Sequence, residues 1–114
     1  METGSVDVLE LTRKLHGEPT LETAIHILQW ELGDLTKSVI YARWHPGLSS
    51  PYLAEARKAL SDLFFQLVVV AQLLGMTPDE AFSIGVEEVR DRIKEKVLGQ
   101  GRFKFYEGDK EDSR

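Results

Sequence analysis

Apolar residues recur every three or four positions along most of this chain, which is the spacing of one face of an α-helix. The first run extends from Val6 to Leu15 and predicts a short helix, which Gly17 and Pro19 end. A second run begins after Thr20, a good capping residue, with Thr23 as a weaker start, and it continues to about Trp44. Its apolar positions form one stripe, made of Leu21, Ile25, Leu28, Leu32, Leu35 and Val39.

Two further helices are predicted after a turn. Residues 45–51 contain two prolines, a glycine and two serines, so the next helix is expected to fold back antiparallel from about Pro51 to Leu74, with Gly75 as its stop. Thr77 and Pro78 then form a helix start, with threonine as the cap and proline in the first turn. The apolar side of this last helix is expected to consist of Phe82, Val86, Val89, Ile93 and Val97.

These elements predict an all-α fold, an antiparallel helical bundle of three main helices plus a short N-terminal helix, completed by homo-oligomerisation. The expected organisation is a short helix and linker at 1–18, a helical domain at 19–98 and a tail at 99–114. Strand-like alternation is confined to 102–105, and the charged end at 108–114 is expected to be disordered.

Composition narrows the classes of partner and site. The chain has 114 residues with 19 acidic and 14 basic side chains, and a net charge of -5 disfavours binding to nucleic acid polymers or anionic membranes. There is no cysteine, which excludes disulfides, thiolate zinc sites and thiol catalysis. The first ten residues show no export signal, and the longest apolar run, Leu63 to Leu74, falls short of the ~20 residues that span a bilayer. A cytoplasmic protein is therefore expected.

Carboxylates interrupt the apolar pattern on two neighbouring helices. Glu31 and Asp34 lie beside the stripe of the second helix, while the third carries a mostly polar line of Glu55, Ala59, Asp62 and Gln66. If these helices pack antiparallel, Glu31, Asp34 and Asp62 converge and repel one another unless a cation is present. Hard oxygen ligands suit Mg²⁺, with Mn²⁺ as a second choice. The alternative is that these acids are helix caps or ion-pair partners of Lys37, Arg57 and Lys58.

Three segments resemble the MazG-like branch of the all-alpha nucleoside triphosphate pyrophosphohydrolases over roughly Leu21 to Lys96. They are Glu31–Leu35, Asp62–Leu67 and Ala71–Ala81. The resemblance implies a homodimer or homotetramer that uses magnesium to convert a nucleoside triphosphate into a monophosphate and pyrophosphate. It also implies that Glu31, Asp34 and Asp62 are both the catalytic residues and the metal ligands.

The chain departs from the family's acidic pattern at two positions. Trp30 stands where the first glutamate of the first motif is usual, and Ala59 stands where the second motif has a glutamate. Glu55, one turn before Ala59 on the same face, is the candidate replacement ligand. The departures leave a second hypothesis, a catalytically impaired relative that binds a nucleotide or a protein as a helical oligomer. A third is a structural oligomer without a site.

Four residues are candidates for contacting the substrate. Trp30 and Lys37 belong to a stripe with Tyr41 and Trp44 that can stack a nucleobase and contact phosphate, or alternatively form a subunit interface. The family resemblance points to Arg92 and Lys96, four residues apart, for contacts to triphosphate oxygens, although basic residues there also complement the helix terminus. The three histidines, His16, His26 and His45, share no metal-ligand spacing and are expected to be ordinary surface or turn residues.

Overall fold

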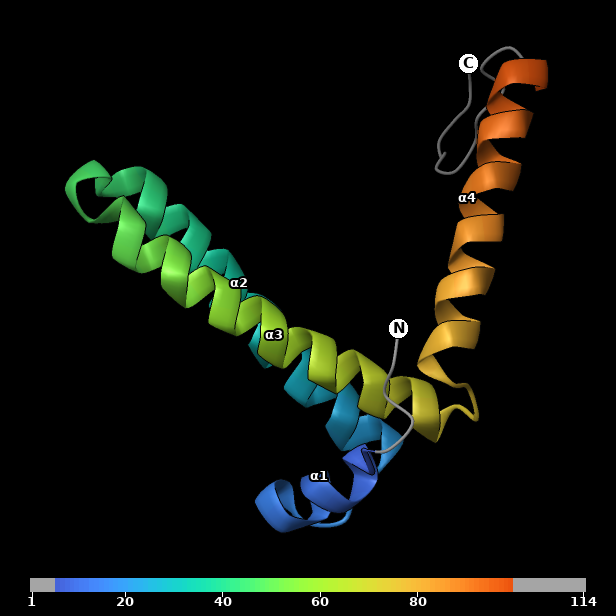
Figure 1. Cartoon of the computed structure of the whole chain (residues 1–114), viewed down its shortest axis with the longest axis horizontal. Coiled ribbons are helices and arrows are strands. Elements are labelled where there is room, and N and C mark those ends of the chain that lie inside the picture. Colours follow the sequence, from blue (N-terminus) through green and yellow to red (C-terminus); the bar gives the residue numbers. More distant parts are fainter. Residues whose placement is uncertain (1–5, 100–114) are drawn as a thin grey trace. The chain divides into compact units, whose positions relative to one another are not determined.

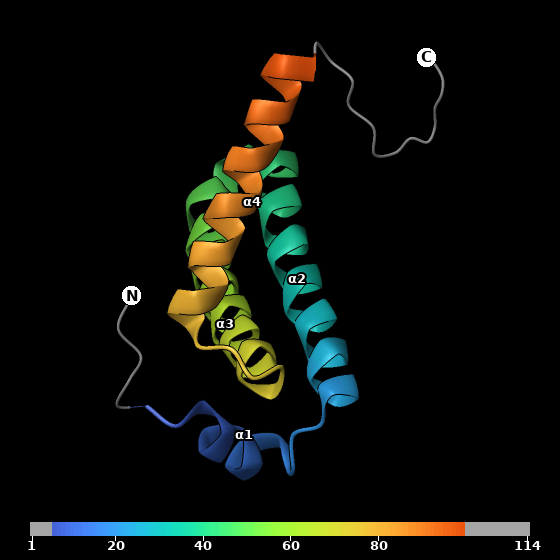
Figure 2. The ribbon, with the colours of Figure 1, turned by 90° about the vertical axis from the view of Figure 1, so that its right-hand side faces the viewer.

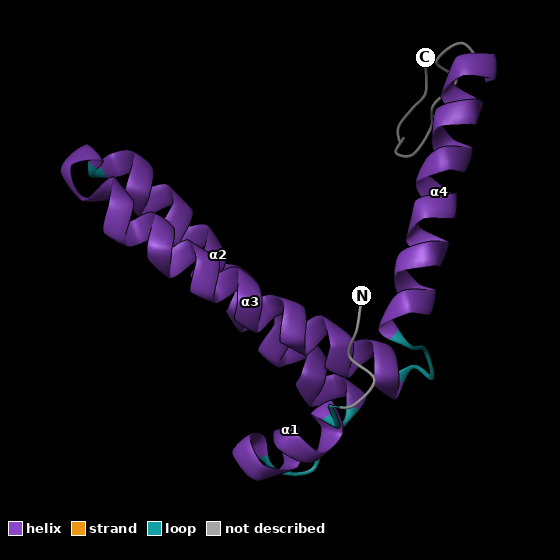
Figure 3. Ribbon diagram, in the orientation of Figure 1, coloured by secondary structure: helices purple, strands orange, loops and turns teal. Residues whose placement is uncertain are grey.

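The computed structural model describes residues 6–99 and is all-α. Of these residues 88% lie in helices and none lies in a strand (Figures 1 and 3). The strand-like segment 102–105 and the tail from residue 100 onward lie outside the described residues. The chain divides into two units, one ending at Pro78 and the other beginning at Asp79, and each is described by itself.

The first helix, α1 (Val8–His16), begins where Asp7 accepts a hydrogen bond from the backbone N–H of Glu10 at 3.1 Å. This is a standard N-terminal cap. The helix packs against α3, and its buried residues are Val8 and Thr12. Leu11 and Leu15 are exposed, at 47% and 76%. The predicted short helix is thus present, and of its apolar positions Val8 is buried while the two leucines are exposed.

The next two helices form an antiparallel hairpin, and both views show them side by side (Figures 1 and 2). Helix α2 (Leu21–Trp44) has the predicted bounds, and Thr20 caps it together with Thr23 in a reciprocal capping box. A single 3-10 turn, η1 (Pro46–Leu48), leads into α3 (Ser49–Leu73), which starts two residues before Pro51. Gly75 follows with a φ of 79°, a left-handed conformation that suits glycine at a helix end.

Small residues form the contact between α2 and α3. The buried positions facing the partner helix include Ala24, Ser38 and Ala42 on α2, and Ala56 and Ala59 on α3. One polar group crosses this contact, because the buried Gln66 side chain donates from Nε2 to the carbonyl oxygen of Ala24 at 3.1 Å. Larger apolar residues gather where α1 meets the end of the hairpin, in a core cluster of Val8, Ala24, Val68, Val69 and Val70.

Most of the large apolar side chains of the hairpin lie beside this contact. At 100° per residue, seven exposed apolar residues of α2 and α3 project to one common side of the two antiparallel helices. We call this side the leucine face; it consists of Leu21, Leu32, Val39, Leu53, Leu60, Phe64 and Leu67, whose exposed fractions run from 42% to 54%. The predicted stripe of α2 is therefore only partly internal, since Leu28 and Leu35 are half-buried but Leu32 and Val39 are exposed.

The second unit contains α4 (Pro78–Gly99), which starts at the predicted proline. Its predicted apolar side is largely exposed within the described residues: Phe82 by 65%, Val89 by 48%, Ile93 by 56% and Val97 by 66%. Among residues 6–99 no single helix is long and apolar enough to cross a membrane. One pair of successive helices reaches that length and composition only when both members are counted together.

Candidate functional site

Glu31 occupies the middle of α2, seven residues after Ala24 and seven before Ser38, so it lies along the line of α2 that faces α3. The antiparallel hairpin brings Asp62 of α3 to the same level, and Asp34 follows Glu31 by three residues, just under one helical turn. Partial burial raises the pKa of Glu31 above its usual range, and the negative charges of Asp62 and Asp34 add to this rise. The structure therefore brings the three predicted carboxylates into one electrostatic neighbourhood.

The three carboxylates do not form a set of metal ligands as they lie. Within residues 6–99, no three histidine, aspartate or glutamate side chains are close enough together to hold a metal ion. Glu31 is half-buried, whereas Asp34 and Asp62 are exposed to water. The arrangement suits a cation that takes one or two carboxylates and completes its shell with water and phosphate oxygens, which is the usual coordination of Mg²⁺ in nucleotide sites.

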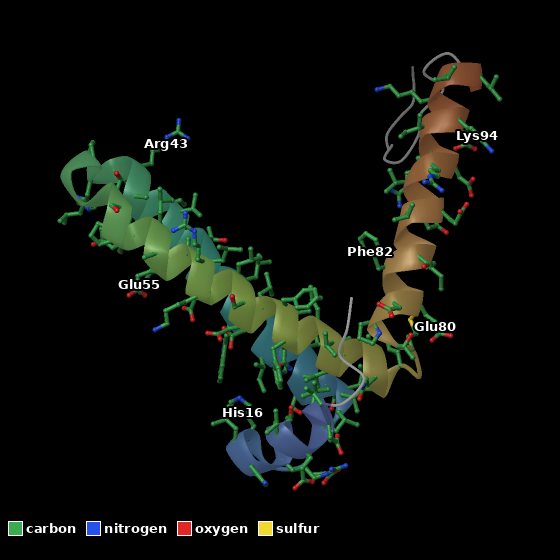
Figure 4. All side chains as sticks on the ribbon, in the orientation of Figure 1. His16, Arg43, Glu55, Glu80, Phe82 and Lys94 are labelled. Atoms are coloured by element: carbon green, nitrogen blue, oxygen red, sulfur yellow. The ribbon has the colours of Figure 1, made fainter. Side chains whose placement is uncertain are left out.

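His16 joins this neighbourhood from α1, and sequence reasoning missed it. A positive charge on His16 lowers the pKa of Glu31 and so opposes the effect of the two aspartates. Figure 4 shows the histidine at the end of α1, on the side turned toward the hairpin. The only sequence signal was the short connection from His16 to α2, because the packing of α1 against α3 decides where the side chain points.

Ala59, where the resemblance to MazG-like enzymes predicts a glutamate, belongs to the contact between the helices. It is 7% exposed and faces α2, so it does not continue the polar line expected from Glu55 to Gln66. Gln66 is also buried, at 3%, while Glu55 and Asp62 are exposed. A carboxylate at position 59 would be buried against α2, which is costly without a partner.

Glu55 lies with a different group of residues. It is seven residues from Asp62, about 10 Å along α3, and it is not among the groups that shift the pKa of Glu31. Figure 4 shows its side chain on the outer surface of α3. The structure thus does not bring Glu55, the predicted substitute ligand, together with the carboxylate cluster.

An open groove of about 520 Å³ runs between α2 and α3 near η1. Its lining residues are Lys37, Ser38, Tyr41, Leu48, Pro51, Tyr52 and Glu55. The Tyr41 and Tyr52 rings meet edge to face with centroids 5.5 Å apart, and His45 lies 6.0 Å from Tyr52. Aromatic walls with a few polar groups, at this volume, are typical of small-molecule sites. The groove therefore adds a candidate binding surface on the same side of the hairpin as Asp34 and Asp62.

The four predicted substrate-contact residues fall into separate places. Lys37 lines the groove, whereas Trp30 is 68% exposed and is not part of the lining. Arg92 and Lys96 lie on α4, in the second unit, so they are described apart from the carboxylates. Of the stripe formed by Trp30, Lys37, Tyr41 and Trp44, only Lys37 and Tyr41 reach the groove.

Comparison of the chain with protein-family models, with curated proteins and with solved structures found no match. The similarity to MazG-like enzymes accordingly stays a prediction from the motif residues. Functional argument for this chain rests on the carboxylates and the groove of the hairpin.

Proposed function

We propose that the protein is a magnesium-dependent nucleotide pyrophosphohydrolase, which converts a nucleoside triphosphate into a monophosphate and pyrophosphate. One observation carries the proposal: the hairpin holds Asp62 near Glu31 and Asp34, so that partial burial first, and then the charges of the two aspartates, raise the pKa of Glu31. Mutual repulsion of this kind is relieved when a divalent cation binds among the acids. The cost of keeping the carboxylates together is offset if the protein uses them to hold such an ion.

Glu31 and Asp62 would hold the ion from the two helices, with Asp34 beside them. Mg²⁺ is suited to a site with two carboxylates because phosphate oxygens and water complete its shell, and Mn²⁺ accepts the same ligands. When bound, the ion would neutralise phosphate charge and activate a water molecule for attack on phosphorus. The half-buried position of Glu31 strengthens its interaction with a cation, since screening by water is reduced there.

The groove near η1 would hold the nucleoside part of the substrate. Lys37 lies six residues after Glu31, about 9 Å along α2, so its ammonium group is positioned to contact a phosphate between the groove and the acids. The edge-to-face Tyr41 and Tyr52 rings offer an aromatic wall for a base. The substrate would then lie along the hairpin, parallel to both helices.

The test is pyrophosphate release from a panel of nucleoside triphosphates with Mg²⁺. Asp62→Asn and Glu31→Gln should each lower kcat by roughly a hundredfold or more, because each removes a carboxylate that would hold the metal ion. Glu22→Gln is the matched control, since it removes an acid from the first turn of α2 and should leave the rate unchanged. Absence of release with every triphosphate, at high protein concentration, would contradict the proposal.

A second candidate function is nucleotide binding without turnover, by a catalytically impaired helical oligomer. The burial of Ala59 favours it, because the hairpin leaves no room there for the additional acid of the related enzymes. Calorimetry with a nucleoside triphosphate distinguishes the two functions: binding without pyrophosphate release supports the second, whereas turnover that Asp62→Asn abolishes rejects it.

A further inference from the structure

We propose that Glu55 selects guanine as the base of the substrate, by accepting hydrogen bonds from the base's N1–H and from its exocyclic amino group at the same time. The base lies in the groove near η1, with its ring on the aromatic wall and its Watson–Crick edge turned toward α3. This inference rests on the proposed function, because it names the nucleoside triphosphate that the same site takes.

The first observation is an aromatic wall that can stack any base. Around the Tyr41 ring, the ring centroids of Trp44, His45 and Tyr52 lie 6.1 Å, 5.9 Å and 5.5 Å away. Tyr41 and Tyr52 both line the groove. Every nucleobase has a π-face, so stacking on such rings gives affinity with little discrimination between bases. Selection of one base therefore depends on the polar groups beside the wall.

The second observation is that Glu55 is the one carboxylate among the residues that line the groove. It follows Tyr52 by three residues on α3, so the two side chains are neighbours on the helix surface. Within residues 6–99 the Glu55 side chain forms no ion pair and no hydrogen bond, although Lys58 lies three residues further along the same helix. Both carboxylate oxygens are therefore available to a ligand in the groove.

The hydrogen-bonding chemistry of a carboxylate distinguishes guanine from the other bases. An ionised carboxylate accepts hydrogen bonds and donates none, so its two oxygens suit a ligand with two adjacent donors. Guanine presents such a pair, in its N1–H and its exocyclic amino group. Adenine and cytosine have a ring nitrogen acceptor beside the amino group, and uracil has a carbonyl oxygen on each side of its N3–H. Each of these three bases sets a lone pair against one oxygen of Glu55, whereas guanine satisfies both oxygens.

Lys37 complements Glu55 from the other helix of the groove. It lies on α2 and carries only donors, which suit phosphate oxygens rather than the donor edge of guanine. Glu55 is separated from Asp62 by about 10 Å along α3, a distance comparable to the length of a nucleoside. A guanosine triphosphate can therefore hold its base edge against Glu55 while its phosphates pass Lys37 toward the carboxylates.

Hydrolysis of guanosine and inosine triphosphates by the full chain with Mg²⁺ tests the selection, because the two substrates differ only in the exocyclic amino group. The parent should have a kcat/KM about tenfold higher for guanosine triphosphate, since inosine loses one hydrogen bond to a charged group. Glu55→Gln should lower this ratio to about one. The same variant should raise kcat/KM for adenosine triphosphate, because a glutamine amide pairs with adenine through one donor and one acceptor.

Glu22→Gln is the matched control, because it makes the same change in the first turn of α2, outside the groove, and it should keep the parent's ratio. A parent ratio near one, or a ratio that Glu55→Gln leaves unchanged, would overturn the selection of guanine while the proposed function stands.

Absence of hydrolysis with every triphosphate contradicts the proposed function instead, and calorimetry then decides the selection by itself. Guanosine triphosphate should bind the parent about tenfold more tightly than inosine triphosphate, for the same lost hydrogen bond, and Glu55→Gln should abolish the difference. Equal affinities of the parent for the two nucleotides, or no binding of either, would reject the role of Glu55.

Discussion

The two long faces of the α2–α3 hairpin differ in every chemical respect. One face carries the seven residues of the leucine face, and the other carries Asp34 and Asp62 with the groove near η1, while Glu31 lies half-buried at the edge of the helix contact. Between them runs the helix contact, which toward η1 is built from alanine and serine and toward α1 from larger residues such as Val69 and Val70. Where the contact residues are small, the helices approach closely and several larger side chains are left on either side. The same packing thus produces both an apolar surface and a polar one.

The largest expected effect comes from placing an acid in the helix contact. Ala59→Glu introduces the residue type that the resemblance to MazG-like enzymes predicts, at a position that is 7% exposed. We expect it to lower the free energy of unfolding by about 3 kcal/mol or more, since it adds both volume and an unpaired charge to a packed site. Thermal melting followed by circular dichroism measures this loss.

The matched control is Lys58→Glu, which places the same side chain one residue earlier at an exposed position. It should change stability by less than about 0.5 kcal/mol. If Ala59→Glu were as stable as the parent and hydrolysed triphosphate faster, Ala59 would belong to the carboxylate side of the hairpin. The distinction between the contact and the candidate site would then fail.

A smaller effect is expected on the leucine face. If the homo-oligomer predicted from the sequence forms through this face, Leu67→Glu should weaken it by about 2 kcal/mol, because an ionised side chain must lose water in the contact. The melting temperature of the parent should rise with protein concentration, and that dependence should disappear in the variant. A variant that melts like the parent at every concentration would mean that nothing covers this position.

Gln66 tests whether the helix contact depends on its one polar bridge. Gln66→Leu removes the 3.1 Å hydrogen bond to the carbonyl oxygen of Ala24 but keeps a side chain of similar size. The expected loss is about 1 kcal/mol, the usual net value of a neutral hydrogen bond. Gln66→Ala, which also opens a cavity, should cost more. Chemical denaturation of both variants separates the two contributions.

The smallest effect concerns the charge of Glu31. Because its folded-state pKa is raised above about 4.5, the folded chain binds more protons than the unfolded chain in the window just above that pH. Stability should therefore fall as pH rises through this window and recover as pH falls. Glu31→Gln should remove the dependence and stabilise the neutral protein by less than about 1 kcal/mol, since screening by water limits the repulsion.

Magnesium should stabilise the folded chain through Glu31, whereas ionisation of Glu31 without a cation destabilises it. It should raise the melting temperature of the parent, because a ligand that prefers the folded state stabilises it, and it should have little effect on Glu31→Gln. An equal rise in both proteins would show that the cation binds elsewhere.

Capping and turn residues were reliable guides to the helix ends. Thr20 starts α2, Pro78 starts α4, and Gly75 follows α3, because each residue satisfies or blocks backbone groups within its own turn. The approach of Asp62 to Glu31 also followed from the sequence, since a short turn forces the two helices to run antiparallel. His16 could not be placed in this way, because its position depends on the packing of α1 against α3.

Helical periodicity by itself determined which side chains share a side of each helix, and local chemistry determined where each helix begins and ends. Only the tertiary structure decided which side faces the neighbouring helix. The sequence favoured the broad apolar stripe of α2, but Ala24, Ser38 and Ala42 make the contact, while Leu32 and Val39 stay exposed. The reason is that small side chains let two backbones come close together, and close packing of this kind depends on both helices at once. The packing of this side of α2 against α3 also buries Ala59 and brings Asp62 near enough to Glu31 to raise its pKa, in addition to the effect of burial.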